Sequence, residues 1–168
     1  MSELTRTGSF SELLQPQSAP SLYAEDFHRW TQETATRLHA KDWEHVDWAA
    51  VIEEIESLGI SQEHAVRRRM MQILLHLLKW VAQPEGRRTG RSWRMSISTQ
   101  RLHIDRLLER SPSLRPQLPG WLVAEYRRAV RGAVQQTGLP REAFPEACPW
   151  TADQVLDDDC WPTTFAEG

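Results

Sequence analysis

The segment from Ser61 to Pro84 constrains the fold more than any other part of this chain. Its pattern predicts one long helix, with Ser61 as the N-cap and Pro84 as the stop, since proline cannot continue a helical hydrogen-bond ladder. At about 100° per residue, its apolar side chains cover most of the helix circumference. These are Ile73, Leu74, Leu75, Leu77, Leu78, Trp80 and Val81. A helix that is apolar on most sides is typical of the centre of a helical bundle.

The rest of the chain predicts further helices and no strand. Apolar residues recur at helical spacing, whereas alternation of period two and β-branched runs are missing. We expect helices over residues 24–40, 48–58, 91–110 and 119–137, beside the central one. The second of these is expected to end at Gly59 and, because the link is so short, to lie antiparallel to the central helix. Thr151 to Gln154 resembles a capping box that starts one short helix.

These elements predict an all-α fold: a single-domain helical bundle of about five helices, with a short irregular C-terminal segment packed on it. We expect a flexible tail over residues 1–20, one domain over 21–162 and a C-terminal tail over 163–168. No apolar run is long enough for a membrane span or a signal peptide. Two cysteines, Cys148 and Cys160, are too few for a disulfide framework. We therefore expect a cytoplasmic protein with free thiols.

The net charge of −3 conceals three successive blocks, which are acidic, basic and acidic. Ala24 to Val66 holds ten acidic and three basic residues, Arg67 to Arg115 twelve basic and three acidic, and Leu139 to the end one basic and seven acidic. Such blocks mark either a nucleic-acid surface or acidic and basic helices that neutralise each other when packed. The acidic blocks on both sides of the basic one favour mutual neutralisation.

A narrow polar stripe interrupts the apolar surface of the central helix. Its members fall within roughly 80° of one another and are Arg69, Gln72, His76, Lys79 and Gln83. In the preceding helix, Glu54 and Glu56 flank the apolar stripe on opposite sides. We expect one of these glutamates to pair with Arg69, Lys79 or Arg101 in a semi-buried network, with His76 hydrogen-bonded in the bundle. Such a network fixes the register of helices more than it stabilises them.

Several motifs follow one another in an order that resembles a known family. They are Asp26-Phe27-x-x-Trp30, Glu53-Glu54-Ile55-Glu56-Ser57-Leu58-Gly59, His76-Leu77-Leu78-Lys79-Trp80, Gln83-Pro84, Ser92-Trp93, Gln100-Arg101, Ser111-Pro112-Ser113-Leu114 and Phe144-Pro145-x-x-Cys148-Pro149. Together they resemble the bacterial, notably cyanobacterial, domain-of-unknown-function family number 29 (DUF29), over about residues 23–162. Cys160 departs from the pattern, which has Phe before Trp161. The resemblance implies an all-helical bacterial protein and supplies neither an activity nor catalytic residues.

Two residues of the central helix offer an enzymatic alternative. Arg69 and His76 stand about two turns apart on one face, a spacing similar to the Arg-x(4–6)-His motif of the helical, metal-independent ribonucleases called HEPN domains. In that resemblance His76 would activate a ribose hydroxyl, Arg69 would support the phosphate, and Glu54 is a further weak candidate for a base. A two-metal site in a bundle needs two Glu-x-x-His pairs. This chain offers only Glu25-x-x-His28, so we predict no metal and no cofactor.

A second alternative involves the arginines that open the fourth predicted helix. Arg87, Arg88, Arg91 and Arg94 surround Trp93, and both helix N-termini and arginines favour phosphate. The first hypothesis is nevertheless a non-enzymatic interaction or structural module, and whether the chain is an enzyme stays open. The alternative is an RNA-binding protein or a HEPN-like ribonuclease. The partners left open are a protein, RNA or a second copy of the chain, and none is a membrane.

Overall fold

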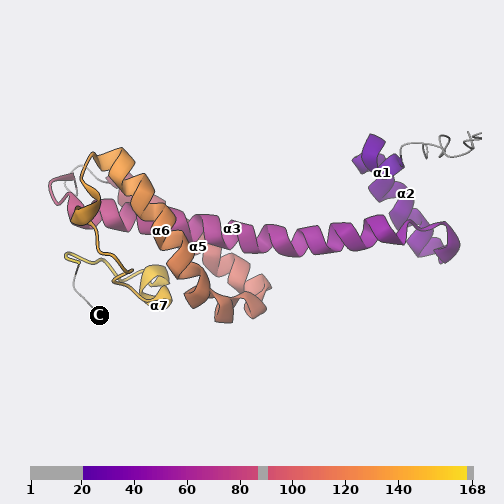
Figure 1. The fold of residues 1–168 in the computed structure, drawn as a ribbon. Helices are drawn as coiled ribbons and strands as arrows, with labels where there is room; N and C mark the ends of the chain where they lie inside the picture. Colours follow the sequence, from indigo (N-terminus) through magenta and orange to yellow (C-terminus); the bar gives the residue numbers. More distant parts are fainter. Residues whose placement is uncertain (1–20, 87–90, 166–168) are drawn as a thin grey trace, which may run out of the picture. The chain divides into compact units, whose positions relative to one another are not determined.

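The computed structural model describes residues 21–86 and 91–165, and all of its regular structure is helical (Figure 1). Six α-helices and three short 3-10 turns follow one another in the described residues. They are α1 (Leu22–Glu25), α2 (Phe27–Ala40), η2 (Trp43–His45), α3 (Trp48–Ala82), α5 (Arg91–Arg110), η3 (Pro112–Gln117), α6 (Leu118–Thr137), η4 (Arg141–Ala143) and α7 (Ala152–Leu156). The predicted all-α class is confirmed. The predicted tail over residues 1–20 lies outside the described residues.

The chain divides into two compact units, residues 1–55 and residues 56–168. The first holds α1, α2, η2 and the first turns of α3, and the second holds everything after them. A single domain over 21–162 stays a prediction, and we describe each unit by itself.

The first unit is small and built around one tryptophan. Asp26 caps α2, because its side chain accepts a hydrogen bond from the Arg29 backbone at 2.9 Å. Trp30 is buried, and its ring packs edge-on against Tyr23 at 4.7 Å between centroids. Thr34, Val46 and Ala50 complete the buried set. Phe27, one turn before Trp30, is 49% exposed, so the apolar face of this helix is only partly buried.

The predicted break at Gly59 is wrong. α3 runs without interruption from Trp48 to Ala82, so Ser61 lies inside the helix and is no N-cap, and the predicted antiparallel pair does not exist. Glycine costs a helix interior only about 1 kcal/mol, which is too little to stop a helix by itself. The left-handed C-cap does occur, but at Gly138, whose φ is 71°.

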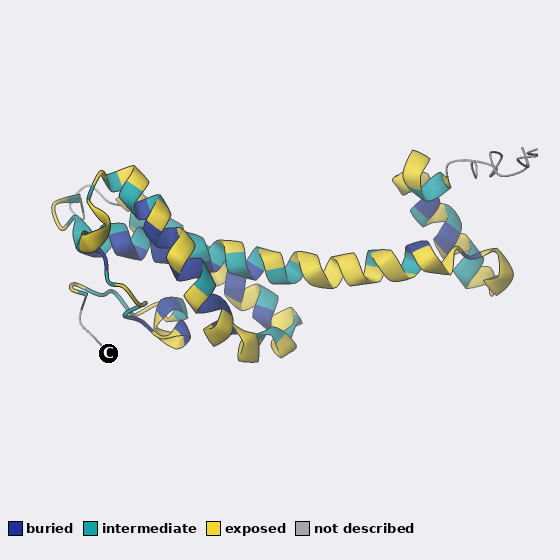
Figure 2. Ribbon diagram, viewed as in Figure 1, coloured by how far each residue is buried: buried dark blue, intermediate teal, exposed yellow. Residues whose placement is uncertain are grey.

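The core of the second unit lies between α3, α5 and α6. The apolar residues predicted for the central helix are buried there except Trp80, which is partly buried, and Ile73, Leu74 and Leu78 are each 0% exposed. From α5 and α6 come Ile97, Ile104, Leu108, Leu122, Tyr126, Ala129, Val130 and Ala133. Figure 2 shows these three helices with buried residues on the sides that face one another. The bounds of α5 agree with the sequence prediction, and α6 begins one residue earlier.

The C-terminal segment packs on this core. Phe144, Trp150 and Val155 are buried in it. The Tyr126 hydroxyl donates to the Pro145 carbonyl at 2.9 Å, which ties the segment to α6. The predicted capping box is present: the Thr151 side chain accepts from the Gln154 backbone, and the Gln154 side chain accepts in return.

Candidate functional site

The cations of the predicted polar stripe tie helices of the second unit together. Arg69 donates from Nη1 to Oε1 of Gln100 at 2.8 Å, which links α3 to α5. Lys79 donates from Nζ to Oε1 of Gln136 at 3.0 Å, and the same nitrogen lies 4.9 Å from the centre of the Trp93 ring. Both partners are neutral. The contacts that these two cations make with other helices are thus to amides and an aromatic ring, and the expected acidic partners form no ion pair with them in the described residues. A register-fixing role of the network stays a prediction.

His76 lies partly buried on α3. Its Nδ1 is buried and has no hydrogen-bond partner within the described ranges 21–86 and 91–165. Burial in the bundle, and secondarily the charge of Lys79, lower the pKa of His76 below its usual 6.5. The imidazole is therefore neutral near pH 7. A ribonuclease pair of Arg69 and His76 stays a prediction. Arg69 already donates a hydrogen bond to the Gln100 side chain.

The two glutamates belong to a different environment. Glu54 accepts a hydrogen bond from the Tyr23 hydroxyl at 2.9 Å, and this bond is the main reason why the pKa of Tyr23 is raised. Glu56 is exposed. Glu54 thus connects α1 with the start of α3 in the first unit.

The candidate phosphate-binding arginines are only partly visible. Arg87 and Arg88 lie outside the described residues. Arg91 is exposed, and the Arg94 guanidinium lies 4.7 Å from the centre of the Trp161 ring. Arg94 is therefore engaged by the C-terminal segment, and phosphate binding by this group stays a prediction.

A buried glutamate on α6 was not among the predicted site residues. Glu125 is 1% exposed and accepts from Arg67 Nε at 2.9 Å and from Arg128 Nη1 at 2.8 Å and 2.9 Å. Arg67 also pairs with Glu63, one turn earlier on α3. The helical spacing did hold a signal, because Glu125 falls on the same face as the buried residues Leu122 and Ala129.

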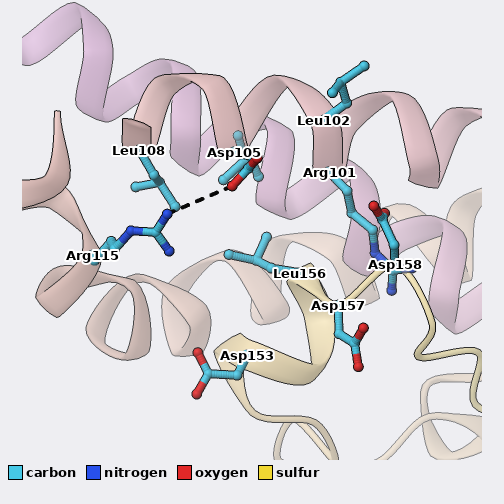
Figure 3. Close-up of a pocket in the computed structure, with 10 residues that line it drawn as sticks. Arg101, Leu102, Asp105, Leu108, Arg115, Asp153, Leu156, Asp157 and Asp158 are labelled. Atoms are coloured by element: carbon cyan, nitrogen blue, oxygen red, sulfur yellow. Dashed lines mark ion pairs between the residues drawn. The ribbon is translucent and has the colours of Figure 1, made fainter. Parts of the chain in front are cut away.

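Arg101 of α5 is the most deeply buried member of the predicted polar network, at 2% exposed. It donates from Nε to the Val155 carbonyl at 2.9 Å and from Nη2 to the Cys160 carbonyl at 3.0 Å. Its guanidinium lies 5.1 Å from the centre of the Trp161 ring. Burial lowers its pKa, against the charges of Asp158, Cys160 and Asp157. Arg101 holds the C-terminal segment on α5 and lines a cavity of about 390 Å³ beside it (Figure 3).

The apolar stripe of the first half of α3 is exposed. Its members are Trp48, 45% exposed, Ile52, 54%, Ile55, 63%, and Leu58, 60%. They follow at intervals of four, three and three residues, so they share one face of the helix. Figure 2 shows this part of α3 as largely exposed, and every residue from 55 to 61 is exposed. Soluble proteins rarely leave such a row in water unless something binds it.

Acidic residues border this stripe. At 100° per residue, Glu54 and Glu56 lie roughly 100° to either side of its centre. Neither lysine nor arginine occurs between Lys41 and Arg67. The expected neutralisation by the basic block is not visible either: within the part of the chain that the structure describes, the ion pair joining the two blocks is Glu63 with Arg67 on the same helix. The stripe thus presents an apolar centre with acidic margins.

The described residues contain no group of three or more His, Cys, Asp or Glu placed to hold a metal ion. None of their helices combines the length and the apolar character that crossing a membrane requires.

Comparison with known proteins identifies a family. No curated protein and no solved structure matches the chain. The family model described as "Domain of unknown function DUF29" matches residues 22–161, which includes part of each compact unit. The chain therefore belongs to the DUF29 family.

Proposed function

We propose that this protein is a non-enzymatic interaction module, which uses the apolar stripe of α3 to bind an amphipathic helix with basic margins. One observation carries the proposal: four large apolar side chains in a row are each about half exposed or more.

The geometry of the stripe suits a helix as the partner. Apolar residues at intervals of three and four form the seam by which helices pair, each side chain entering a gap between side chains of the facing helix. Each large apolar side chain removed from water contributes on the order of 1.5–3 kcal/mol. Trp48 is a side chain of the type that dominates such interfaces.

The margins of the stripe decide the charge of the partner. Glu54 and Glu56 would lie beside the flanking residues of a docked helix. A second copy of the chain on the same stripe would bring glutamate against glutamate, which costs free energy. Lysine or arginine at those positions would instead gain from both glutamates. We therefore infer a basic helix of another protein rather than a homodimer through this face.

Binding of two synthetic peptides tests this proposal. The first is an amphipathic helix with leucine on one face and lysine along both margins, and the second carries glutamate in place of every lysine. We expect the full chain to bind the lysine peptide at least roughly tenfold more tightly by calorimetry, with the difference shrinking at high salt. Equal affinities for both peptides, or no binding of either, would contradict the proposal. A stable dimer of the free chain, formed through the stripe, would also contradict the proposal.

A further inference from the structure

A second candidate binding site lies between α3 and α6, wholly within the second unit and apart from the apolar stripe. It is a cavity of about 380 Å³, lined by His64, Arg67, Arg68 and Met71 of α3 and by Glu125 and Arg128 of α6. Its volume falls in the range of roughly 300–1,000 Å³ that is usual for small-molecule sites. His64 and Arg68 are exposed, and the Arg128 side chain is 54% exposed, so a ligand can reach these groups from solvent.

Cations from both helices converge on this cavity. On α3, His64 stands three positions before Arg67 and four before Arg68, and residues three or four apart are neighbours on a helix surface. Arg128 reaches the same place from α6. It donates to Oε1 of Glu125 at 2.8 Å, and Arg67 donates to the same oxygen at 2.9 Å. Two guanidinium groups thus meet at one carboxylate oxygen, and a third lines the cavity beside them.

Glu125 orients these arginines and does not fill the cavity, since it is 1% exposed. Arg67 uses Nε for Glu125 and Nη1 for Glu63, whereas Arg128 uses only Nη1. Nη2 of Arg67, and Nε and Nη2 of Arg128, make no hydrogen bond within the part of the chain that the structure describes. Donors that a buried partner holds in place, with further N–H groups left over, are already oriented for a ligand.

The cavity holds more positive than negative charge. Its lining carries three arginines and one glutamate, and Arg68 forms no ion pair among the described residues. Glu63 pairs with Arg67 from outside the lining, which still leaves one cation in excess. Residues 64–84 contain neither Asp nor Glu, and Glu125 is the single acidic residue in the sequence of α6. Neither helix therefore offers a further carboxylate to cancel this charge, which attracts an anion.

We propose that this cavity binds a small molecule that carries a phosphomonoester group. Such a group has a charge of roughly −2 at neutral pH and three acceptor oxygens. The planar fork of arginine matches phosphate oxygens, and three arginines are available to them here. His64 supplies a further donor, and the rest of the ligand lies on Met71. None of the described lining residues is Phe, Tyr or Trp, on which nucleic-acid bases stack, and this favours a small molecule over a nucleic acid.

Thermal unfolding and calorimetry with a series of probes test the inference, at an ionic strength held constant with potassium chloride. Glycerol 3-phosphate should raise the midpoint of unfolding in a concentration-dependent way, because it binds the folded chain only. Dimethyl phosphate, a diester with a single negative charge, should bind at least roughly tenfold more weakly, and glycerol should not bind. Dodecauridylate without a terminal phosphate presents phosphodiesters only. It should bind more weakly than glycerol 3-phosphate.

Variants locate the site without touching Arg67 or Arg128, whose loss would leave Glu125 unpaired. Arg68→Gln should weaken binding of glycerol 3-phosphate at least roughly tenfold. Its midpoint without ligand should equal that of the wild type, because Arg68 is exposed. Arg106→Gln is the matched control, because Arg106 of α5 is also exposed and does not line the cavity.

Three results would overturn the inference. The first is the absence of any effect of glycerol 3-phosphate on the wild type. The second is equal binding by Arg68→Gln and Arg106→Gln, since the effect would then reflect net charge alone or no site at this cavity. The third is tighter binding of dodecauridylate than of glycerol 3-phosphate, which would identify the arginines as a nucleic-acid surface.

Discussion

Arg67 on α3 and Glu125 on α6 are joined by a hydrogen bond of 2.9 Å across 58 positions of sequence, although the carboxylate is buried and the arginine side chain is 24% exposed. Arg128 holds both oxygens of the same carboxylate from the next turn of α6. The buried charge therefore depends on two partners that reach it from the surface.

This arrangement predicts an asymmetry between substitutions. Arg67→Ala combined with Arg128→Ala leaves Glu125 as a lone buried charge and should lower the free energy of unfolding by about 3–5 kcal/mol. Glu125→Met removes the buried charge, lets both arginines turn to solvent and should be neutral or stabilising. Urea unfolding of the three proteins is the measurement. A larger loss in Glu125→Met than in the double variant would show that the ion pairs themselves stabilise the packing of α3 on α6.

His76 should make stability depend on pH below neutrality. Its folded pKa is lowered by burial, so the unfolded chain takes up the proton first as the pH falls below 6.5. The contribution is fully present above pH 6.5 and is lost as the pH falls through the folded pKa. His76→Gln lacks this term, so its stability should fall less than that of the wild type between about pH 7.5 and pH 5.5. Parallel urea midpoints for both proteins would refute the buried, neutral imidazole.

Two weak acids, the partly buried Cys148 and the buried Tyr126, should set an alkaline limit to stability. Burial raises the pKa of the Cys148 thiol from 9.0 to about 11 and that of the Tyr126 hydroxyl from 10.0 to about 12. Their contribution to stability is full well below pH 9, where both groups stay protonated in the unfolded chain, and is lost as the pH rises through 11 and 12.

Cys148→Ala should therefore unfold at a higher pH than the wild type. The Cys148 thiol of the folded wild type should also react with iodoacetamide far more slowly than a cysteine in a short peptide at about pH 8, since the thiolate is the reacting form. Rapid alkylation of Cys148, located by mass spectrometry, would contradict its burial.

Gly59 tests the continuity of α3. A Cβ at this position meets nothing within 4 Å, so Gly59→Ala should stabilise the chain by about 0.5–1 kcal/mol. Gly138→Ala is the control, because its φ of 71° strains any side chain and should make the variant less stable. If α3 broke at Gly59 with a left-handed cap, both substitutions would destabilise, and thermal unfolding would reveal it.

The comparison of sequence with structure separates local signals from tertiary ones. The ends of α5 and α6 followed from Pro112, Gly138 and helical spacing, and the capping box at Thr151 was present as predicted. These features depend on residues within one or two turns of the helix end, so they can be predicted from the local sequence.

Gly59 shows the limit of such signals. Glycine is compatible both with a C-cap and with a helix interior, and the difference in free energy depends on what the flanking turns contact. A break at Gly59 predicts two antiparallel helices, whereas the continuous helix leaves Ile52 and Ile55 exposed. Periodicity reveals that a helix has an apolar face, but not whether that face is buried within its own chain.

The candidate site was predictable only in part. Arg101 was predicted as a possible partner of Glu54 or Glu56, yet it donates to the carbonyls of Val155 and Cys160, which lie more than 50 positions away. Glu125 was not predicted, because the sequence does not show that Arg67 and Arg128 bind its carboxylate and so allow a charged residue on the inward face.

The central claim is that the stripe of α3 is free in the isolated chain and binds a basic helix. The direct measurement compares two variants. One is the triple variant Ile52→Gln/Ile55→Gln/Leu58→Gln, and the control is Ile60→Gln. Ile60 is also apolar and 54% exposed, but it lies on the opposite side of the same helix. The triple variant should unfold at nearly the same midpoint as the wild type and bind the lysine peptide at least roughly tenfold more weakly, whereas Ile60→Gln should bind it fully. A large loss of stability in the triple variant, or equal peptide affinity in both variants, would contradict the account.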